Sequence, residues 1–73
     1  MDNQKAAILK VIAANIVEIR KQKGITQEQL AHKANIDRSY MGYIENAKHN
    51  ISVGMLERIA IALDVEIIKL VSK

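Results

Sequence analysis

Few residues of this 73-residue chain are of the types that catalyse reactions or bind metals. The chain has no cysteine, and its two histidines, His32 and His49, have neither metal-site spacing nor clustered carboxylates beside them. Ser39 and Ser52 lack a histidine and a carboxylate in an arrangement that would activate a hydroxyl group. We therefore expect a protein that is not an enzyme, holds no metal and needs no cofactor.

The most informative stretch is GITQEQLAHKANIDRSYMGYIEN, residues 24–46, which predicts two short helices joined by a tight turn. Thr26 and Gln29 have the spacing of a capping box at the start of the first helix, expected over residues 27–34. Asn35 suits the left-handed conformation in which a helix ends. The second helix is polar on one face. Such a pair is typical of a helix-turn-helix unit, although helix pairs in ordinary bundles use similar caps.

The rest of the chain predicts further helices around this pair. Repeated apolar positions, no proline and only three glycines favour an all-α fold in one domain, residues 1–73. We expect a long helix over residues 5–23 and another over residues 53–63. The last segment, residues 65–71, fits either an imperfect strand or a short helix. The inward stripe of the long helix is expected to contain Ile8, Ile12, Ile16 and Ile19, and to be widened by Leu9, Val11, Ala13 and Val17.

The C-terminal segment is more apolar than a small monomer can readily bury. Both interpretations of it leave Ile68 without an obvious place in the core of a 73-residue monomer. Apolar surface of this kind marks an oligomer interface, so we expect a homodimer. The expected interface residues are Val65, Ile67, Ile68 and Val71.

The charge of the chain favours a polyanionic partner. The net charge is +3, and residues 1–50 hold eight Lys and Arg against five Asp and Glu, whereas residues 51–73 hold three of each. The excess therefore lies with the predicted helix pair, although many proteins with a similar surplus bind no polyanion. The sequence shows neither a signal-peptide profile nor a membrane span. We expect a soluble cytoplasmic protein without a membrane partner.

Three motifs in order and at fixed spacing resemble the Cro/C1-type helix-turn-helix family of phage repressors and bacterial regulators. They are T-Q-E-x-L-A at residues 26–31, I-E-N at residues 44–46, and L-x-x-I-A-x-A-L-x-V at residues 56–65. The resemblance covers residues 16–70. It implies a compact five-helix, lambda-repressor-like DNA-binding domain.

Two shorter segments resemble one group within the family most, the controller proteins of restriction–modification systems. They are D-R-S-Y at residues 37–40 and I-S at residues 51–52. The resemblance implies a transcriptional regulator that binds double-stranded DNA as a dimer, on a pseudo-palindromic operator near its own promoter. RNA polymerase would be a further partner. Two alternatives stay open: an antitoxin-type or other helical protein-interaction module with secondary DNA binding, and a small phage-type repressor.

The resemblance also implies roles for single residues. The second helix of the pair would enter the DNA major groove, where an arginine can bridge O6 and N7 of guanine. Base reading is expected from Arg38, Ser39 and Tyr43, with Tyr40 near the backbone or thymine methyl groups. Phosphate contacts are expected from Gln27, Asn46, Lys48 and His49. An ion pair between Arg20 and Glu45 would tie the long helix to the end of the recognition helix.

Several of these residues have structural alternatives. Arg38 could instead be solvated, or pair with Asp37 or Glu45, and either tyrosine could fill the core, since the chain has no other aromatic residue of the Phe, Trp or Tyr type. Gly42 is unusual inside a helix, where glycine costs about 1 kcal/mol relative to alanine. It indicates a close approach of the backbone to DNA or to the preceding helix. The family often has glycine at the position of Ala47. The conformation of the turn there is therefore not predicted.

Overall fold

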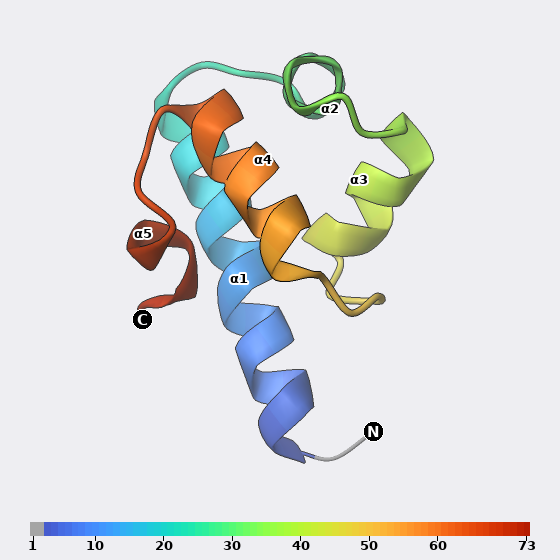
Figure 1. Cartoon of the computed structure of the whole chain (residues 1–73), viewed down its shortest axis with the longest axis vertical. Coiled ribbons are helices and arrows are strands. Elements are labelled where there is room, and N and C mark those ends of the chain that lie inside the picture. The colour runs from blue at the N-terminus through green and yellow to red at the C-terminus, as the bar shows by residue number, and fades with distance from the viewer. Residues whose placement is uncertain (1–2) are drawn as a thin grey trace.

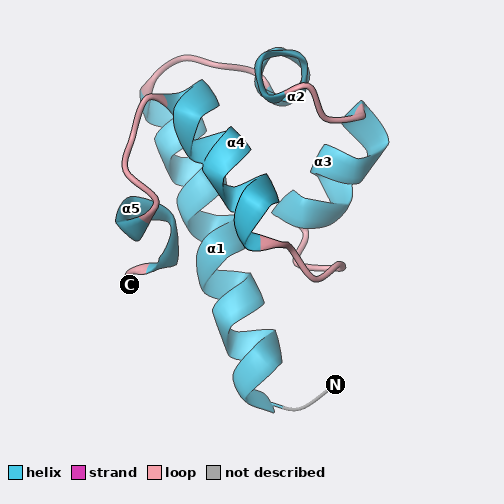
Figure 2. Cartoon of the chain, in the orientation of Figure 1, coloured by secondary structure: helices cyan, strands magenta, loops and turns pink. Residues whose placement is uncertain are grey.

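The chain folds into five α-helices (Figure 1). The computed structural model describes residues 3–73, with side chains from residue 7 onward. The helices are α1 (Asn3–Gln22), α2 (Gln27–Ala34), α3 (Arg38–Glu45), α4 (Val53–Leu63) and α5 (Ile68–Val71). Loops and turns join them throughout the described residues (Figure 2). The all-α, five-helix prediction is confirmed, and the C-terminal segment contains a short helix rather than a strand.

The core is aliphatic and draws on every helix. The long helix α1 packs against α3 and α5, while α2 packs against α3 and α4. The six largest fully buried side chains are Ile16, Leu30, Met41, Ile59, Leu63 and Leu70. Because each helix supplies at least one of them, α2 and α3 are held by the whole domain as well as by each other. None of the helices in the described part of the chain has the length and apolar character to cross a membrane.

The predicted inward stripe of α1 is wrong at Ile8, whose side chain is exposed. Leu9 and Ala13 are buried in addition to Ile12 and Ile16, so the buried stripe begins one residue later. The N-terminal part of α1 runs past the other helices (Figure 1). The apolar periodicity of α1 therefore continues into its N-terminal part, where no other helix packs against it.

Four helices end in the same backbone motif. The left-handed residues that end them are Gly24, Asn35, Ala47 and Asp64, with φ between 55° and 69°. After α2, for example, the Asn35 amide donates to the His32 carbonyl at 3.1 Å and the Ile36 amide donates to the Ala31 carbonyl at 2.8 Å. This pair of bonds is the Schellman motif, which satisfies carbonyl groups at a helix end. The left-handed ending predicted for Asn35 is confirmed.

The turn after α3 differs from the other three. Ala47 adopts a left-handed conformation, φ 57°, and its amide donates to the Ile44 carbonyl at 3.1 Å. The next residue is Lys48, which is exposed. The corresponding residues after the other three turns are apolar and pack in or against the core: Ile25, Ile36 and Val65. The chain after α3 is therefore directed along the surface instead of into the core.

Asn15 fastens the C-terminal helix to α1. Its Nδ2 donates to the backbone carbonyls of Leu70, at 3.0 Å, and Ser72, at 2.7 Å. Helix α5 has only four residues, which is too short for a helix to be stable by itself. The Asn15 bonds, together with the burial of Leu70, hold it in place.

We expect opposite stability changes when the side chain is removed or added at two equivalent left-handed positions. Ala47→Gly should raise the free energy of unfolding by about 1 kcal/mol, because a left-handed conformation costs a residue with Cβ roughly that much. Gly24→Ala should lower it by a similar amount, although an added Cβ there meets no atom within 4 Å. Urea denaturation of both variants measures the changes. Equal effects of the same sign would contradict this account of the turns.

Candidate nucleic-acid interface

Helix α3 has one face in the core and one face in solvent. Met41 and Ile44 are buried, whereas Arg38, Ser39 and Tyr43 are exposed. The three exposed residues are those predicted to read DNA bases. The inner face thus fixes the helix, and the outer face leaves their polar groups accessible.

Side-chain caps begin both helices of the pair. At the start of α2, the Gln29 amide donates to Thr26 Oγ1 at 3.1 Å and the Thr26 amide donates to Gln29 Oε1 at 2.9 Å. The predicted capping box is confirmed. At the start of α3, Asp37 Oδ2 accepts hydrogen bonds from the amides of Ser39, at 3.0 Å, and Tyr40, at 3.4 Å. These bonds satisfy amide groups that have no partner within the helix.

Arg20 and Glu45 form a bidentate ion pair between α1 and the end of α3. Arg20 Nε lies 2.9 Å from Glu45 Oε2, and Nη2 lies 3.1 Å from Oε1. The side chains are only 13% and 5% exposed. Arg20 Nη1 also donates to the Ile25 carbonyl at 3.0 Å. One guanidinium group therefore joins α1, the turn before α2, and α3.

Gln27 joins the same group of hydrogen bonds from the first turn of α2. Its Nε2 donates to Glu45 Oε1 at 3.1 Å, and its side chain is partly buried. In the free protein the amide is thus engaged with Glu45. Its expected phosphate contact remains a prediction, to which the free amides at the N-terminus of α2 could add.

Gly42 is close to Gln27 but not crowded by it. A Cβ added at Gly42 would lie 3.9 Å from Gln27 Oε1, which is ordinary van der Waals distance. Packing against α2 therefore does not require a glycine here. The alternative reason, close approach of DNA to the α3 backbone, remains a prediction.

Arg38 has a different partner from those that the sequence suggested. Its Nη2 lies 3.7 Å from Glu28 Oε1 on α2, with the two side chains 67% and 71% exposed. Pairing with Asp37 or Glu45 is wrong, because Asp37 caps α3 and Glu45 is bonded to Arg20. An ion pair this exposed is weak, so the guanidinium group stays available to another acceptor.

The two tyrosines of α3 lie in different environments. Tyr40 is partly buried and packs against the core, so the core-filling alternative holds in part for it. Tyr43 is 47% exposed and does not fill the core. The ring of His49 lies beside both, with centroid separations of 5.7 Å to Tyr40 and 4.9 Å to Tyr43. The sequence did not indicate that these rings meet.

The remaining expected phosphate ligands surround the end of α3. Asn46 is exposed, but its Nδ2 donates to the Gly42 carbonyl of its own helix at 2.8 Å. Lys48 and His49 follow in the loop and are exposed. Lys48 therefore brings a cationic side chain to the same end of the molecule as Tyr43.

Arg58 is a positioning residue that the sequence analysis missed. From α4, its guanidinium group donates to the carbonyls of Ala34, at 3.1 Å, and Asn35. It thereby places a positive charge at the C-terminus of α2, where the helix dipole favours one. Because the bonds join residues 24 and 23 positions apart in the chain, no local pattern reveals them.

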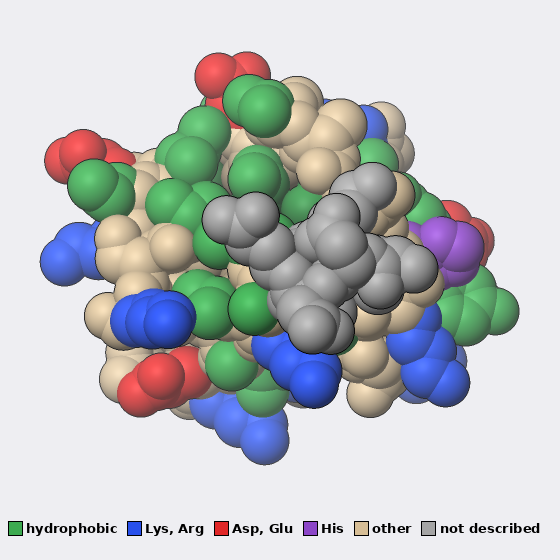
Figure 3. Space-filling view, turned by 90° about the horizontal axis from the view of Figure 1, so that it is seen from below, with side chains coloured by type: hydrophobic (Ala, Val, Ile, Leu, Met, Phe, Trp, Pro, Cys, Tyr) green, Lys and Arg blue, Asp and Glu red, His purple; other side chains and the backbone are tan. Residues whose placement is uncertain are grey.

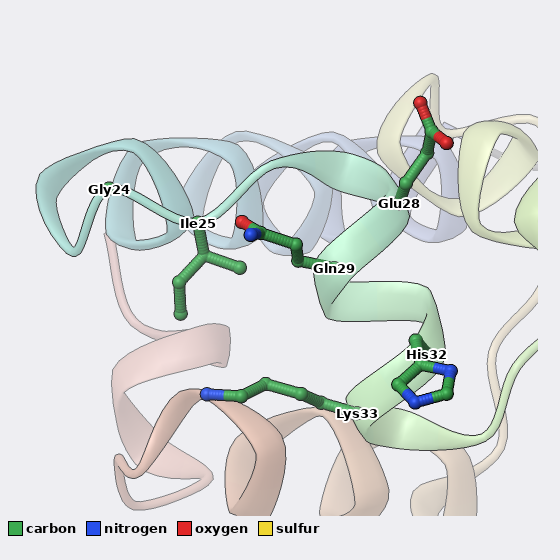
Figure 4. Close-up of a pocket in the computed structure, with 6 residues that line it drawn as sticks. All are labelled: Gly24, Ile25, Glu28, Gln29, His32 and Lys33. Carbon is green, nitrogen blue, oxygen red and sulfur yellow. The ribbon is translucent and has the colours of Figure 1, made fainter.

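An open hollow lies beside the outer face of α2 and the turn before it (Figure 4). Its lining residues are Gly24, Ile25, Glu28, Gln29, His32 and Lys33. Glu28 and Lys33 carry opposite charges and point in different directions (Figure 4). Among the described residues, no three His, Cys, Asp or Glu side chains come together as a metal site. We assign no ligand to the hollow, because its polar groups do not converge.

The four residues predicted to form a dimer interface do not share one environment. Val65, Ile67 and Val71 pack against the core of their own chain, whereas Ile68 is 60% exposed. Ile61 on α4 is also exposed. Hydrophobic side chains gather on the side of the molecule where α4 and α5 lie (Figure 3). Three of the four residues thus stabilise the monomer, whereas Ile68 is largely exposed, and its place in a dimer interface remains a prediction.

Comparison with known proteins finds relatives over most of the chain. The helix-turn-helix family model HTH_3 matches residues 16–70. The immunity repressor protein of Bacillus phage phi105 is 40% identical over 62 residues, which cover 85% of this chain and 43% of the repressor. A hypothetical transcription factor of Neisseria meningitidis is 38% identical over 55 residues, 75% of this chain and 52% of that protein. The chain therefore spans about half the length of these two relatives.

Shorter relatives match the chain nearly end to end. Control protein C.SmaI of Serratia marcescens is 30% identical over 66 residues, which cover 90% of this chain and 79% of that protein. The crystal structure of the restriction-modification controller protein C.AhdI from Aeromonas hydrophila has a TM-score of 0.84 and 38% identity. The similarity covers 88% of this chain and 97% of C.AhdI.

The ion pair of Arg20 and Glu45 should matter far more for stability than the pair of Arg38 and Glu28. Arg20→Ala should lower the free energy of unfolding by about 3 kcal/mol, because it leaves a buried carboxylate without its partner. Arg38→Ala is the matched control and should change it by less than about 0.5 kcal/mol, since that pair is exposed. Denaturant titration of both variants compares them. Similar losses of unfolding free energy in the two variants would show that the buried Glu45 carboxylate does not need Arg20 as its partner.

Proposed function

The chain belongs to the Cro/C1-type helix-turn-helix family, and from that premise we propose that it is a sequence-specific transcriptional regulator of double-stranded DNA. The observation that carries the proposal is the division of α3 into a buried face and an exposed face with Arg38, Ser39 and Tyr43. Membership of a family of DNA-binding regulators agrees with the expectation that the chain is not an enzyme.

The arrangement of α2 and α3 supports insertion of α3 into the major groove. The exposed Arg38 guanidinium lies on the first turn of α3, where helix-turn-helix proteins contact base edges. Ser39 and Tyr43 continue the same exposed face. Lys48, in the loop after α3, would meet the phosphate backbone on one side, and the N-terminus of α2 would meet it on the other.

Within this family we propose that the protein acts as a controller of a restriction–modification system. The support is its similarity to two proteins named as controllers, most of whose length it spans. A phage-type repressor is the second candidate, supported by similarity to the phi105 repressor, of which the chain spans less than half. Activation of its own promoter at low protein concentration would distinguish a controller from a simple repressor. RNA polymerase would then be a partner, and the bacterial cytoplasm the place of action.

We place the dimer surface over α4 and α5, around the exposed side chains of Ile61 and Ile68. Burying two isoleucines against a second copy removes apolar area from water in both chains. A two-fold dimer would present two copies of α3 about 34 Å apart, one turn of DNA. This spacing makes a pseudo-palindromic operator the expected target.

Selection of bound sites from random double-stranded DNA tests the function directly. We expect enrichment of a pseudo-palindrome whose half-sites are centred about 10 base pairs apart, because each copy of α3 reads one half-site. An enriched but asymmetric single half-site would contradict the dimer. A pool without any enriched motif would overturn sequence-specific binding and favour the interaction-module alternative.

Arg38→Ala should reduce discrimination between the selected operator and random DNA. An arginine bridging guanine O6 and N7 is worth about 1–3 kcal/mol of discrimination, whereas its loss removes little from non-specific binding. Lys48→Ala is the matched control: it should weaken both kinds of complex and reduce the slope of log affinity against log salt by about 0.9. Titrations at several salt concentrations measure both effects. Equal losses on operator and random DNA for Arg38→Ala would overturn its base-reading role.

A further inference from the structure

Three rings meet where the recognition helix ends. The imidazole of His49 lies 4.9 Å from the ring of Tyr43, centroid to centroid, with an angle of 63° between the planes. It lies 5.7 Å from the ring of Tyr40, at 48°. The first arrangement is edge-to-face, the geometry that aromatic pairs favour. The chain has no Phe, no Trp and only these two tyrosines, so all of its Phe, Trp and Tyr rings are in this cluster.

The backbone after α3 brings His49 to the tyrosines. The left-handed conformation of Ala47 reverses the chain, and the Lys48 amide donates to the carbonyl of Tyr43 at 2.9 Å. The Asn46 side chain donates to the Gly42 carbonyl at 2.8 Å. These two hydrogen bonds hold the start of the loop against the carbonyl groups of Gly42 and Tyr43 in α3. His49 comes directly after Lys48 in the chain, and its ring lies beside the two tyrosines of α3.

Two residues of α3 near Tyr43 have little or no side chain. Ser39 and Tyr40, one turn earlier, share the face of Tyr43. Ser39 has a small side chain, and the Tyr40 ring packs against the core and lies beside His49. Gly42, the neighbour of Tyr43, has no side chain. An exposed ring with few packed neighbours samples several rotamers, and ordering it on binding reduces affinity. The imidazole of His49 supplies a neighbour that limits this freedom.

We propose that His49 is a positioning residue that fixes the ring of Tyr43 on the recognition surface before DNA arrives. The ring of Tyr40, which packs against the core, also lies beside the imidazole. The inference rests on the proposed function, in which α3 reads bases. It differs from the phosphate contact expected of His49 from the sequence. A phosphate contact strengthens binding to any DNA, whereas ordering Tyr43 strengthens only the contacts that discriminate between sequences.

Substitutions of His49 separate the two roles. His49→Ala should lower the ratio of operator affinity to random-DNA affinity by about two- to tenfold, the range corresponding to one aromatic pair. Affinity for random DNA and the salt slope should not change. His49→Phe keeps a ring without its charge or hydrogen-bonding groups and should retain the wild-type ratio. Asn50→Ala, an exposed substitution in the same loop, is the control and should behave as wild type.

A double-substitution cycle tests whether His49 acts through Tyr43. In a Tyr43→Ala background, His49→Ala should cause no further loss of the affinity ratio. Additive losses would overturn positioning through Tyr43. Equal losses on operator and random DNA, together with a smaller salt slope, would assign His49 to a phosphate contact instead.

The free protein provides a readout that needs no DNA. The ring-proton resonances of Tyr43 should shift in nuclear magnetic resonance spectra of His49→Ala, because the imidazole no longer lies beside the ring, and should stay in place in Asn50→Ala. If site selection enriches no motif, the proposed function fails while shifted resonances still support the ring contact. Unshifted resonances overturn the positioning role whatever the DNA measurements give.

Discussion

The position of helix α3 depends on one carboxylate. Glu45 sits at the end of α3 with its side chain 5% exposed, and it accepts hydrogen bonds from Arg20 on α1 and Gln27 on α2. A carboxylate removed from water is costly unless its oxygens find donors, so three helices must keep their ends together. The bidentate geometry adds direction to this requirement, because Nε and Nη2 of Arg20 must each face one oxygen of Glu45. The interaction therefore fixes the angle of α3 relative to α1 and α2.

The short helices need such ties because they are weak by themselves. Helices α2 and α3 have eight residues each and α5 has four, all below the length at which an isolated helix is stable in water. Arg58 closes the end of α2 from α4, and Asn15 closes the end of α5 from α1. Long-range side-chain bonds thus replace the stability that longer helices would have. The Schellman turns let the chain reverse within a few residues, which keeps the helices near enough for these bonds.

The parts of the fold that the sequence predicts well are those decided within a few residues. Thr26 and Gln29 specify the start of α2, and Asn35 specifies its end, since each cap needs only neighbouring backbone groups. The bonds of Asn15 span 55 and 57 residues, so they depend on a register between helices that periodicity does not supply. Segment 65–71 was ambiguous because a helix of four residues is too short to show a period.

At the candidate site, too, contacts between distant parts of the chain are harder to predict than local ones. The resemblance to a family supplied Arg20 and Glu45 as a pair, and the structure contains it. The pairing of Arg38 could not be predicted, because it depends on Glu28 of α2 lying nearby in the folded chain.

The surface around α3 combines features that are unfavourable for the free protein. Gly42 weakens the interior of the helix, Ala47 holds a left-handed conformation, and Tyr43 leaves 47% of its side chain in water. None of the three contributes to the core, so stability alone gives no reason for them. All lie within six residues at the end of α3, next to the loop that carries Lys48 and His49. Local features that oppose stability are expected where a surface is shaped for binding, and their concentration here supports placing the DNA-contacting surface at α3 and the following loop.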